Sequence, residues 1–288
     1  MLSFEIKKGE NLAIIGESGC GKSTLLQLIY GQHDVNEGVI FWNNSKIIGP
    51  KNQLIPGMPF MKYLSQDFGL MPYISVAENI GKYLSNFFPE QKKARIKTLL
   101  NTVEMTAFAN TKVKNLSGGQ MQRVALASVL ALPPEVLLLD EPFSHIDNFR
   151  KNSLRRNIFH FLKKENITTI VATHDSTDVL SFSDAVLVLK EGKKVAFDTP
   201  ENTYNRPKNY YVASLFGDVN EIKIEGKVRY IYPHQIKLTS FSNTKVEVLN
   251  IYYRGTCYLI EAKYETAKLF FEHDYPLVAG EFVYINLI

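Results

Sequence analysis

The sequence predicts an α/β fold with a largely parallel sheet, followed by a small all-β domain. Three observations support this prediction. A short buried strand at residues 11–16 runs into a glycine loop and a helix, further apolar strands alternate with helical stretches, and after about residue 217 only short alternating strands remain. Alternating strands and helices are typical of parallel sheets, and the 288-residue length favours two globular units over one.

The first unit is expected at residues 1–217 and the second at 218–288, with the join near Gly217 and Asp218. After the strand at 11–16, the first unit is expected to contain strands at 136–139, 168–172 and 185–189 and helices at 22–30, 90–104, 120–132 and 149–165. The second unit is expected to contain strands at 222–231, 245–253, 256–264, 268–272 and 281–287. A series of short strands with turns between them favours a barrel or a sandwich.

Composition and charge argue against several classes of protein. The formal net charge is +4, which is too small to favour nucleic acid as the main partner. The two cysteines, Cys20 and Cys257, form no CxxC pair, which disfavours a disulfide framework or a zinc site and favours a reducing cytosolic setting. No apolar run reaches the roughly 18 residues of a membrane-spanning helix, and the charged N-terminus is unlike a signal peptide. If the protein works at a membrane, we expect a separate chain to span it.

The glycine loop matches the phosphate-binding pattern GxxxxGK[ST] at every fixed position. Its glycines let successive backbone N–H groups turn toward one anion, and the helix that follows directs its positive end at the same point. Lys22 is expected to reach the β- and γ-phosphates of ATP, and the Ser23 hydroxyl to ligate Mg²⁺. At Cys20 a small tolerated residue is favoured over a reactive thiol. The loop residues expected to bind ATP are Gly16, Glu17, Ser18, Gly19, Cys20, Gly21, Lys22, Ser23 and Thr24.

Two acidic residues, Asp140 and Glu141, follow the apolar strand at 136–139. Open α/β sheets bind ligands at the carboxyl ends of their strands. We expect Asp140 to hold Mg²⁺, through water, and Glu141 to act on the attacking water as a general base or an orienting group. Paired acids at this position can also cap a neighbouring helix, but beside a phosphate loop the catalytic interpretation is favoured.

The segment Leu116-Ser117-Gly118-Gly119-Gln120 resembles the signature motif of the ATP-binding-cassette (ABC) ATPases. Serine and two glycines before a helical stretch form a second anion-binding helix N-terminus, and one ATP does not need two on one chain. The resemblance implies a P-loop NTPase cassette with a helical subdomain at about 67–130. It also implies a head-to-tail dimer with a second copy of the chain or a homologous cassette. In such a dimer, Ser117, Gly118, Gly119 and Gln120 close on the ATP of the partner.

Three more segments are similar to motifs of this family, in the family's order. Gln66 matches the glutamine that contacts the metal and the attacking water, and is expected to serve both catalysis and Mg²⁺ binding. His174 follows the strand at 168–172 and matches the switch histidine that contacts the γ-phosphate. Asp147 matches the aspartate that crosses the dimer interface, although His145 stands where the family usually has a small residue. The resemblance covers nearly all of 1–217.

The end of the chain resembles one branch of the family, the importers of sugars, polyamines, ferric iron and oxyanions. Residues 197–217 look like the end of that group's ATPase domain, and residues 218–288 look like its TOBE domain, a small OB-like β domain. This implies a peripheral subunit at the cytoplasmic face of the inner (plasma) membrane, with a separate permease and a separate substrate-binding protein. The permease is expected to dock near Phe68–Tyr73, a segment that can also be an ordinary packed loop.

One feature of the family has no counterpart. The aromatic residue that stacks on adenine would lie upstream of Met1, and Phe4 aligns better with a core position. Either a genuine N-terminal segment is lacking, which we favour because a missing edge strand would expose the sheet, or adenine is held loosely. The alternative functions are an ABC-fold ATPase of DNA repair or of translation, and an exporter motor. The first two usually carry coiled coils, zinc cysteines or a second cassette, which this sequence lacks.

Overall fold

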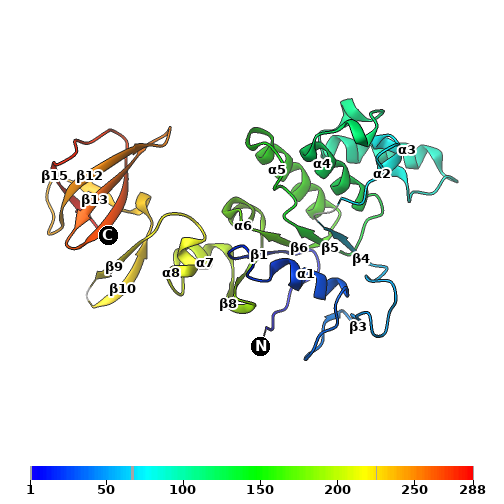
Figure 1. Ribbon diagram of the computed structural model, residues 1–288, viewed down its shortest axis with the longest axis horizontal. Coiled ribbons are helices and arrows are strands. Elements are labelled where there is room, and N and C mark those ends of the chain that lie inside the picture. The colour runs from blue at the N-terminus through cyan, green and yellow to red at the C-terminus, as the bar shows by residue number, and fades with distance from the viewer. Residues whose placement is uncertain (1, 66–67, 225, 288) are drawn as a thin grey trace. The chain divides into compact units, whose positions relative to one another are not determined.

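The computed structural model describes residues 2–65, 68–224 and 226–287 (Figure 1). The chain divides by its internal contacts into two compact units, Met1–Pro200 and Glu201–Ile288. This division lies before the break at Gly217 that the sequence suggests. The reason is an aromatic contact within the second unit, where the ring of Tyr204 stacks on Tyr232 with centroids 4.3 Å apart. The functional boundary at 217 and 218 stays a prediction.

The first unit is built on a six-stranded sheet with the order β4-β5-β6-β1-β7-β8. Neighbouring strands pair in parallel from β4 to β7, and β8 pairs antiparallel to β7. Every residue of β1, β5 and β6 is buried, as expected for strands covered on both faces. The predicted α/β fold with a largely parallel sheet is therefore confirmed. The strands are β1 (Asn11–Ile15), β4 (Met61–Leu64), β5 (Val136–Asp140), β6 (Thr168–Thr173), β7 (Ala185–Lys190) and β8 (Lys193–Asp198).

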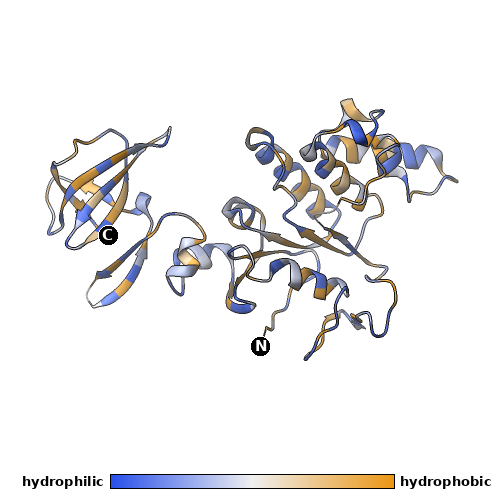
Figure 2. Cartoon of the chain, viewed as in Figure 1, coloured by the Kyte–Doolittle hydropathy of each residue, from blue (hydrophilic) through white to orange (hydrophobic). Residues whose placement is uncertain are grey.

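Two hydrophobic clusters cover the two faces of this sheet. One is formed with α1 (Lys22–Tyr30) and includes Leu26 and Ile29. The other is formed with α4 (Gly118–Val129) and α5 (Asn148–Lys164) and includes Val124 and Leu154. Helices α1 and α4 consequently lie in different layers (Figure 1), and Figure 2 shows hydrophobic residues along the strands between them. The sequence predicted these three helices to within a few residues.

The segment between β4 and β5 is mainly helical. Its helices are α2 (Val76–Gly81), α3 (Pro89–Thr102), η1 (Thr106–Phe108), η2 (Val113–Asn115) and α4. Helix α2 begins at a capping box, in which Ser75 and Glu78 satisfy each other's backbone N–H groups. Helix α3 begins with Pro89, whose fixed φ suits the first helical position. The remaining elements of this unit are α6 (Ser176–Phe182) and the short strands β2 (Phe41–Trp42) and β3 (Ser45–Lys46).

The second unit is mostly β structure, which confirms the predicted all-β domain. Two short helices, α7 (Pro200–Asn205) and α8 (Tyr210–Ser214), precede a hairpin and a five-stranded antiparallel sheet with the order β11-β15-β12-β13-β14. The single strand expected at 222–231 is wrong, because two strands pair there as a hairpin around Gly226, whose φ of +79° suits a tight turn. The strands are β9 (Asn220–Ile224), β10 (Lys227–Ile231), β11 (Lys237–Thr239), β12 (Lys245–Tyr253), β13 (Tyr258–Tyr264), β14 (Ala267–His273) and β15 (Phe282–Asn286), with η3 (Pro233–Gln235) between β10 and β11.

Glu261 of β13 has a buried carboxylate whose protonation is expected to destabilise the second unit in acid. Its Oε1 lies 2.6 Å from Lys268 Nζ, and its Oε2 accepts hydrogen bonds from the Tyr252 hydroxyl (2.7 Å) and Asn250 Nδ2 (3.1 Å). The hydrogen bonds from Lys268 and Tyr252 lower the pKa of Glu261 from 4.5 to about 2. Because the folded pKa is the lower one, this stabilisation is complete above pH 4.5 and is lost as the pH falls toward 2.

We therefore expect Glu261→Gln to lower the free energy of unfolding at pH 7, and the difference from wild type to shrink as the pH falls below 4.5. Urea unfolding of the full chain at pH 7, 5 and 3 measures this difference. Glu265→Gln, on the exposed turn after β13, is the control. A difference that stays constant down to pH 3 would contradict the ion-pair explanation.

Candidate active site

The loop between β1 and α1 presents an uncovered helix N-terminus. Gly19 and Gly21 have φ values of +78° and +103°, in the left-handed region that glycine adopts without strain. Gly21 is the N-cap of α1, and no side chain caps the helix within the described chain. The first-turn N–H groups of α1 are consequently available to an anion such as a phosphate.

Lys22, the first residue of α1, is held inside this loop. Its side chain is buried, and Nζ donates hydrogen bonds to the carbonyl oxygens of Gly16 (2.8 Å) and Glu17 (3.0 Å). Cys20 packs into the hydrophobic cluster below α1, with Sγ 4.0 Å from Lys22 Nζ. The loop thus concentrates one ammonium group and a helix N-terminus at the carboxyl end of β1, a combination that binds phosphate groups.

Asp140, the last residue of β5, lies at the same edge of the sheet. Its Oδ2 accepts a hydrogen bond from the Tyr63 hydroxyl (3.3 Å), and its buried Oδ1 has no hydrogen-bond partner among the described residues. Burial raises the pKa of Asp140, and hydrogen bonds from Ser23 and Tyr63 oppose that rise. Tyr63 could not be recognised as a site residue from the sequence, because a tyrosine on a sheet strand usually serves packing.

A buried carboxylate oxygen without a partner fits a magnesium ion, because Mg²⁺ prefers oxygen ligands. Asp140 and the Ser23 hydroxyl are the described residues that would hold it. In residues 2–65, 68–224 and 226–287, no three His, Cys, Asp or Glu side chains converge as a metal cluster. That fits Mg²⁺, which takes most of its ligands from phosphates and water. Gln66, the other predicted ligand, lies outside the described residues.

Glu141 and His174 are brought together by the register of two parallel strands. Asp140 pairs with Ala172, so the residues that follow β5 and β6 emerge side by side, and the Glu141 backbone N–H donates to the Ala172 carbonyl (2.9 Å). Glu141 Oε1 lies 3.1 Å from His174 Nδ1. The Glu141 carboxylate is partly buried and the His174 ring is exposed. A carboxylate and an imidazole in contact can accept a proton from a water molecule and orient that water.

The backbone of Glu141 is itself unusual, since its φ is +47°. Residues other than glycine rarely adopt this left-handed conformation, which costs about 1–2 kcal/mol and persists only where neighbouring groups fix it. Such strain often marks a functional position.

The predicted signature motif forms the start of α4, in the layer opposite α1. Ser117 is the N-cap, its Oγ accepts from the Gln120 N–H (3.3 Å), and Gln120 Oε1 accepts from the Ser117 N–H (2.9 Å). The side chain of Asp147, the N-cap of α5, makes no capping bond within the described chain. The His145 ring packs edge-on against Phe68, with centroids 6.0 Å apart.

A buried ion network behind His174 was not indicated by the sequence. Arg155 of α5 forms an ion pair with Asp178 (2.5 Å between Nε and Oδ1) and bonds the carboxylate of Asp175. Asp175 caps α6 through the Thr177 N–H (2.9 Å) and directly follows His174. Arg155 therefore fixes the chain on which His174 is carried.

Phe4 occupies a core position rather than a binding position. Its ring packs against Phe197, with centroids 6.1 Å apart, and it lies against the hydrophobic cluster below α1. The expectation that Phe4 is not the adenine-stacking residue agrees with this contact.

Comparisons with known proteins identify the family of the chain. A family model described as "ABC transporter" matches residues 1–144. The spermidine/putrescine import ATP-binding protein PotA of Bacillus thuringiensis (strain 97-27) is 35% identical over 272 residues, which cover 93% of this chain and 81% of that protein. The Fe(3+) ions import ATP-binding protein FbpC of Fusobacterium nucleatum is 34% identical over 224 residues, or 77% of this chain and 59% of that protein.

Two solved structures are similar to the chain as well. The dimeric post-hydrolysis state of the ATP-binding cassette MJ0796, bound to ADP and Pi, has a TM-score of 0.59 at 30% identity and covers 68% of this chain and 88% of its own. The structure of cbiO1 from Clostridium perfringens, described as part of an ABC transporter complex, has a TM-score of 0.61 at 29% identity and covers 71% of this chain and 83% of its own.

Proposed function

This chain belongs to the ABC transporter family and is an ATPase that uses ATP with Mg²⁺, and we propose that it is the ATP-hydrolysing subunit of an importer. The observation that carries the proposal is the Glu141–His174 pair, 3.1 Å apart at the sheet edge that also holds Lys22 and Asp140. The import direction is supported by likeness to an import ATP-binding protein along 93% of the chain, which includes most of the second unit. DNA repair and translation have no comparable support.

The proposed reaction is hydrolysis of ATP to ADP and phosphate. Lys22 and the N-terminus of α1 bind the β- and γ-phosphates, and Glu141 accepts a proton from the attacking water while His174 orients that water. Mg²⁺ held by Ser23, Asp140 and Gln66 would neutralise charge on the phosphates. A second copy of the chain would complete the site with Ser117, Gly118, Gly119, Gln120 and Asp147.

The position of the signature motif supports the dimer. Helices α1 and α4 pack on opposite faces of the sheet, so their N-termini belong to different layers of one chain. Two such anion-binding ends are both used when two chains associate head to tail. MJ0796, which is similar to 68% of this chain, is dimeric in its solved structure.

We propose a separate permease as the membrane-spanning partner and a peripheral position at the cytoplasmic face of the membrane. None of the helices that the structure describes is long and apolar enough to span a bilayer. We also propose a separate substrate-binding protein. Because relatives that import polyamines and ferric ions match at almost equal identity, the transported substrate is selected by those partners rather than by this chain.

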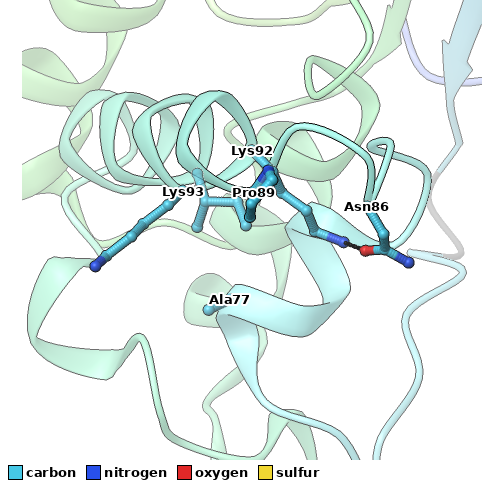
Figure 3. Close-up of a pocket in the computed structure, with 6 residues that line it drawn as sticks. Ala77, Asn86, Pro89, Lys92 and Lys93 are labelled. Atoms are coloured by element: carbon cyan, nitrogen blue, oxygen red, sulfur yellow. Dashed lines mark hydrogen bonds between the residues drawn. The ribbon is translucent and has the colours of Figure 1, made fainter.

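The docking surface for the permease is proposed on the segment Phe68–Tyr73 and the neighbouring helices. Phe68 and Leu70 pack against the core, whereas Met71 and Tyr73 are exposed. A hollow of about 310 Å³ lies between α2 and α3, with an apolar floor and two lysines at its rim (Figure 3). An apolar groove with basic edges suits an amphipathic helix that carries acidic residues. The hollow is lined by Ala77, Asn86, Pro89, Lys92, Lys93 and Ile96.

ATP hydrolysis by the full chain, alone and with its permease in lipid vesicles, tests this function. Phe88 is exposed at the start of α3, next to Pro89 of the hollow. We expect the permease to stimulate hydrolysis, and Tyr73→Ser with Phe88→Ser to remove the stimulation while basal hydrolysis stays. Ile55→Ser is the control, since Ile55 is an exposed apolar residue outside this surface. Hydrolysis that no permease changes would overturn the transport proposal, and nucleic acid and ribosomes would then be tested as partners.

A further inference from the structure

One buried glutamine joins the signature helix to the catalytic carboxylate of the same chain. Gln122 of α4 is 3% exposed. Its Nε2 donates to the Glu141 carbonyl (3.0 Å) and to Ser144 Oγ (3.3 Å), and its Oε1 accepts from the His145 N–H (3.1 Å). Replacing this buried amide is costly, because it removes hydrogen bonds from three groups of one loop, which are the Glu141 carbonyl, the Ser144 hydroxyl and the His145 N–H.

A second contact joins the same helix to the same loop. Gly119 lies one helical turn before Gln122, on the same face of α4. A Cβ added at Gly119 would lie 2.5 Å from the His145 carbonyl oxygen, closer than such atoms approach. The backbone of the signature motif therefore rests directly on the backbone of His145 and Ile146, and no side chain fits between them.

These contacts also explain how Glu141 keeps its left-handed backbone. Its carbonyl accepts from both Gln122 Nε2 and the Ser144 hydroxyl (3.0 Å), and its N–H donates to the Ala172 carbonyl. The peptide groups on both sides of the strained φ are thus fixed by other elements. Without Gln122, the Glu141 carbonyl would keep only the hydrogen bond from the Ser144 hydroxyl, so the strained backbone that places the carboxylate beside His174 would be held less firmly.

We propose that Gln122 is a positioning residue that makes α4 and the segment 141–146 move as one body. The proposal rests on the head-to-tail dimer of the proposed function. There, the signature motif of one chain closes on the nucleotide of its partner, while Glu141 of that chain acts on its own nucleotide. When the signature motif closes on the partner's nucleotide, it therefore moves Glu141 into its catalytic position at the chain's own nucleotide. Through this coupling the two sites hydrolyse ATP cooperatively.

The test compares Gln122→Met, which keeps the size but removes all three hydrogen bonds, with Ser128→Ala on the same helix. The Ser128 hydroxyl bonds the Asn79 carbonyl (3.2 Å), away from the loop, so Ser128→Ala controls for any loss of a polar group from α4. Steady-state hydrolysis gives kcat, KM and the Hill coefficient, and a fluorescent ATP analogue gives nucleotide affinity. We expect Gln122→Met to lower kcat by roughly 10- to 100-fold, to leave nucleotide affinity unchanged, and to bring the Hill coefficient to one.

Two outcomes would overturn the proposal. A kcat of Gln122→Met like that of Ser128→Ala would show that Glu141 does not depend on Gln122. A low kcat with an unchanged Hill coefficient would show that Gln122 supports the fold but does not couple the sites. If Gln122→Met does not fold, Ser144→Ala, on the exposed side of the same network, is expected to give a smaller change of the same kind.

Measurements on the wild-type chain distinguish a failure of this proposal from a failure of the proposed function on which it rests. Hydrolysis without cooperativity in the wild type would overturn the coupling between sites, although the kcat comparison would still test the positioning of Glu141. No hydrolysis by the wild type, alone or with the permease, would instead overturn the function itself.

Discussion

Glu141→Gln is expected to bind ATP as the wild-type chain does and to hydrolyse it roughly 10²- to 10⁴-fold more slowly, the usual contribution of a general base. The amide has nearly the size of the carboxylate and can keep the contact with His174 Nδ1, which lies 3.1 Å from Glu141 Oε1. It cannot accept a proton at neutral pH. The variant should therefore assemble the site and stop before the attack of water, so that the dimer stays closed around ATP.

Nucleotide affinity, single-turnover hydrolysis and size-exclusion chromatography with ATP and Mg²⁺ measure these three expectations. Glu37→Gln is the matched control, since it makes the same substitution at an exposed position outside the site. Wild-type hydrolysis by Glu141→Gln would show that another group takes the proton. A variant that no longer binds ATP would place Glu141 in binding rather than in catalysis.

Much of the site could be predicted because its parts are local in the sequence. The phosphate loop needs glycines, a lysine and a hydroxyl at fixed spacing between a strand and a helix, and the structure has β1, the loop and α1 at those residues. Asp140 and Glu141 could be predicted because an apolar strand ends immediately before them. His174 could be paired with Glu141 because parallel strands end at one edge of the sheet, and the two side chains are indeed in contact.

The supporting residues could not be predicted, because each acts across elements that are distant in sequence. Gln122 and Arg155 are polar residues within helices, where a solvent-exposed position is the ordinary expectation. Their partners, Glu141 and Asp178, follow different strands, so only the packing of α4 and α5 on the sheet brings them together. The sequence predicts one strand at 222–231 where the structure has a hairpin, because the alternation of apolar and polar residues continues through the turn.

The division of the chain at Pro200 has a similar cause. The sequence changes character near Gly217, where helices give way to strands. The contacts change earlier, because α8 is bound to the β domain by a hydrogen bond from the Tyr232 hydroxyl to the Ala213 carbonyl (3.2 Å) and α7 by the stacking of Tyr204 on Tyr232. Aromatic contacts between segments this far apart leave no periodic signal in a single sequence.

Arg155→Met should lower the free energy of unfolding by about 3–5 kcal/mol at neutral pH, the usual cost of removing one partner from a buried ion pair. The side chains of Arg155 and Asp178 are each 3% exposed, so without Arg155 the Asp178 carboxylate would be a buried charge without its ion-pair partner. Only Lys151, 4.0 Å from Asp175, would remain as a described cation at the network. Arg156→Met, at the exposed neighbouring position, is the control, and equal stability of the two variants would show that the network does not hold the fold.

The pH dependence of this effect separates a lost charge pair from lost packing. Burial raises the pKa of Asp178 even with Thr173 and Arg155 beside it, and without Arg155 it should rise further. A raised carboxyl pKa favours the folded state below the ordinary value of 3.8 and disfavours it as the pH rises through the folded value. Urea unfolding should therefore show the deficit of Arg155→Met shrinking as the pH falls from 7 toward 4. A loss of stability that does not change with pH would show that the lost packing of the Arg155 side chain, rather than the lost charge pair, is its cause.

Because Asp175 directly follows His174 and is held by Arg155, the variant should also hydrolyse ATP more slowly under conditions in which it stays folded.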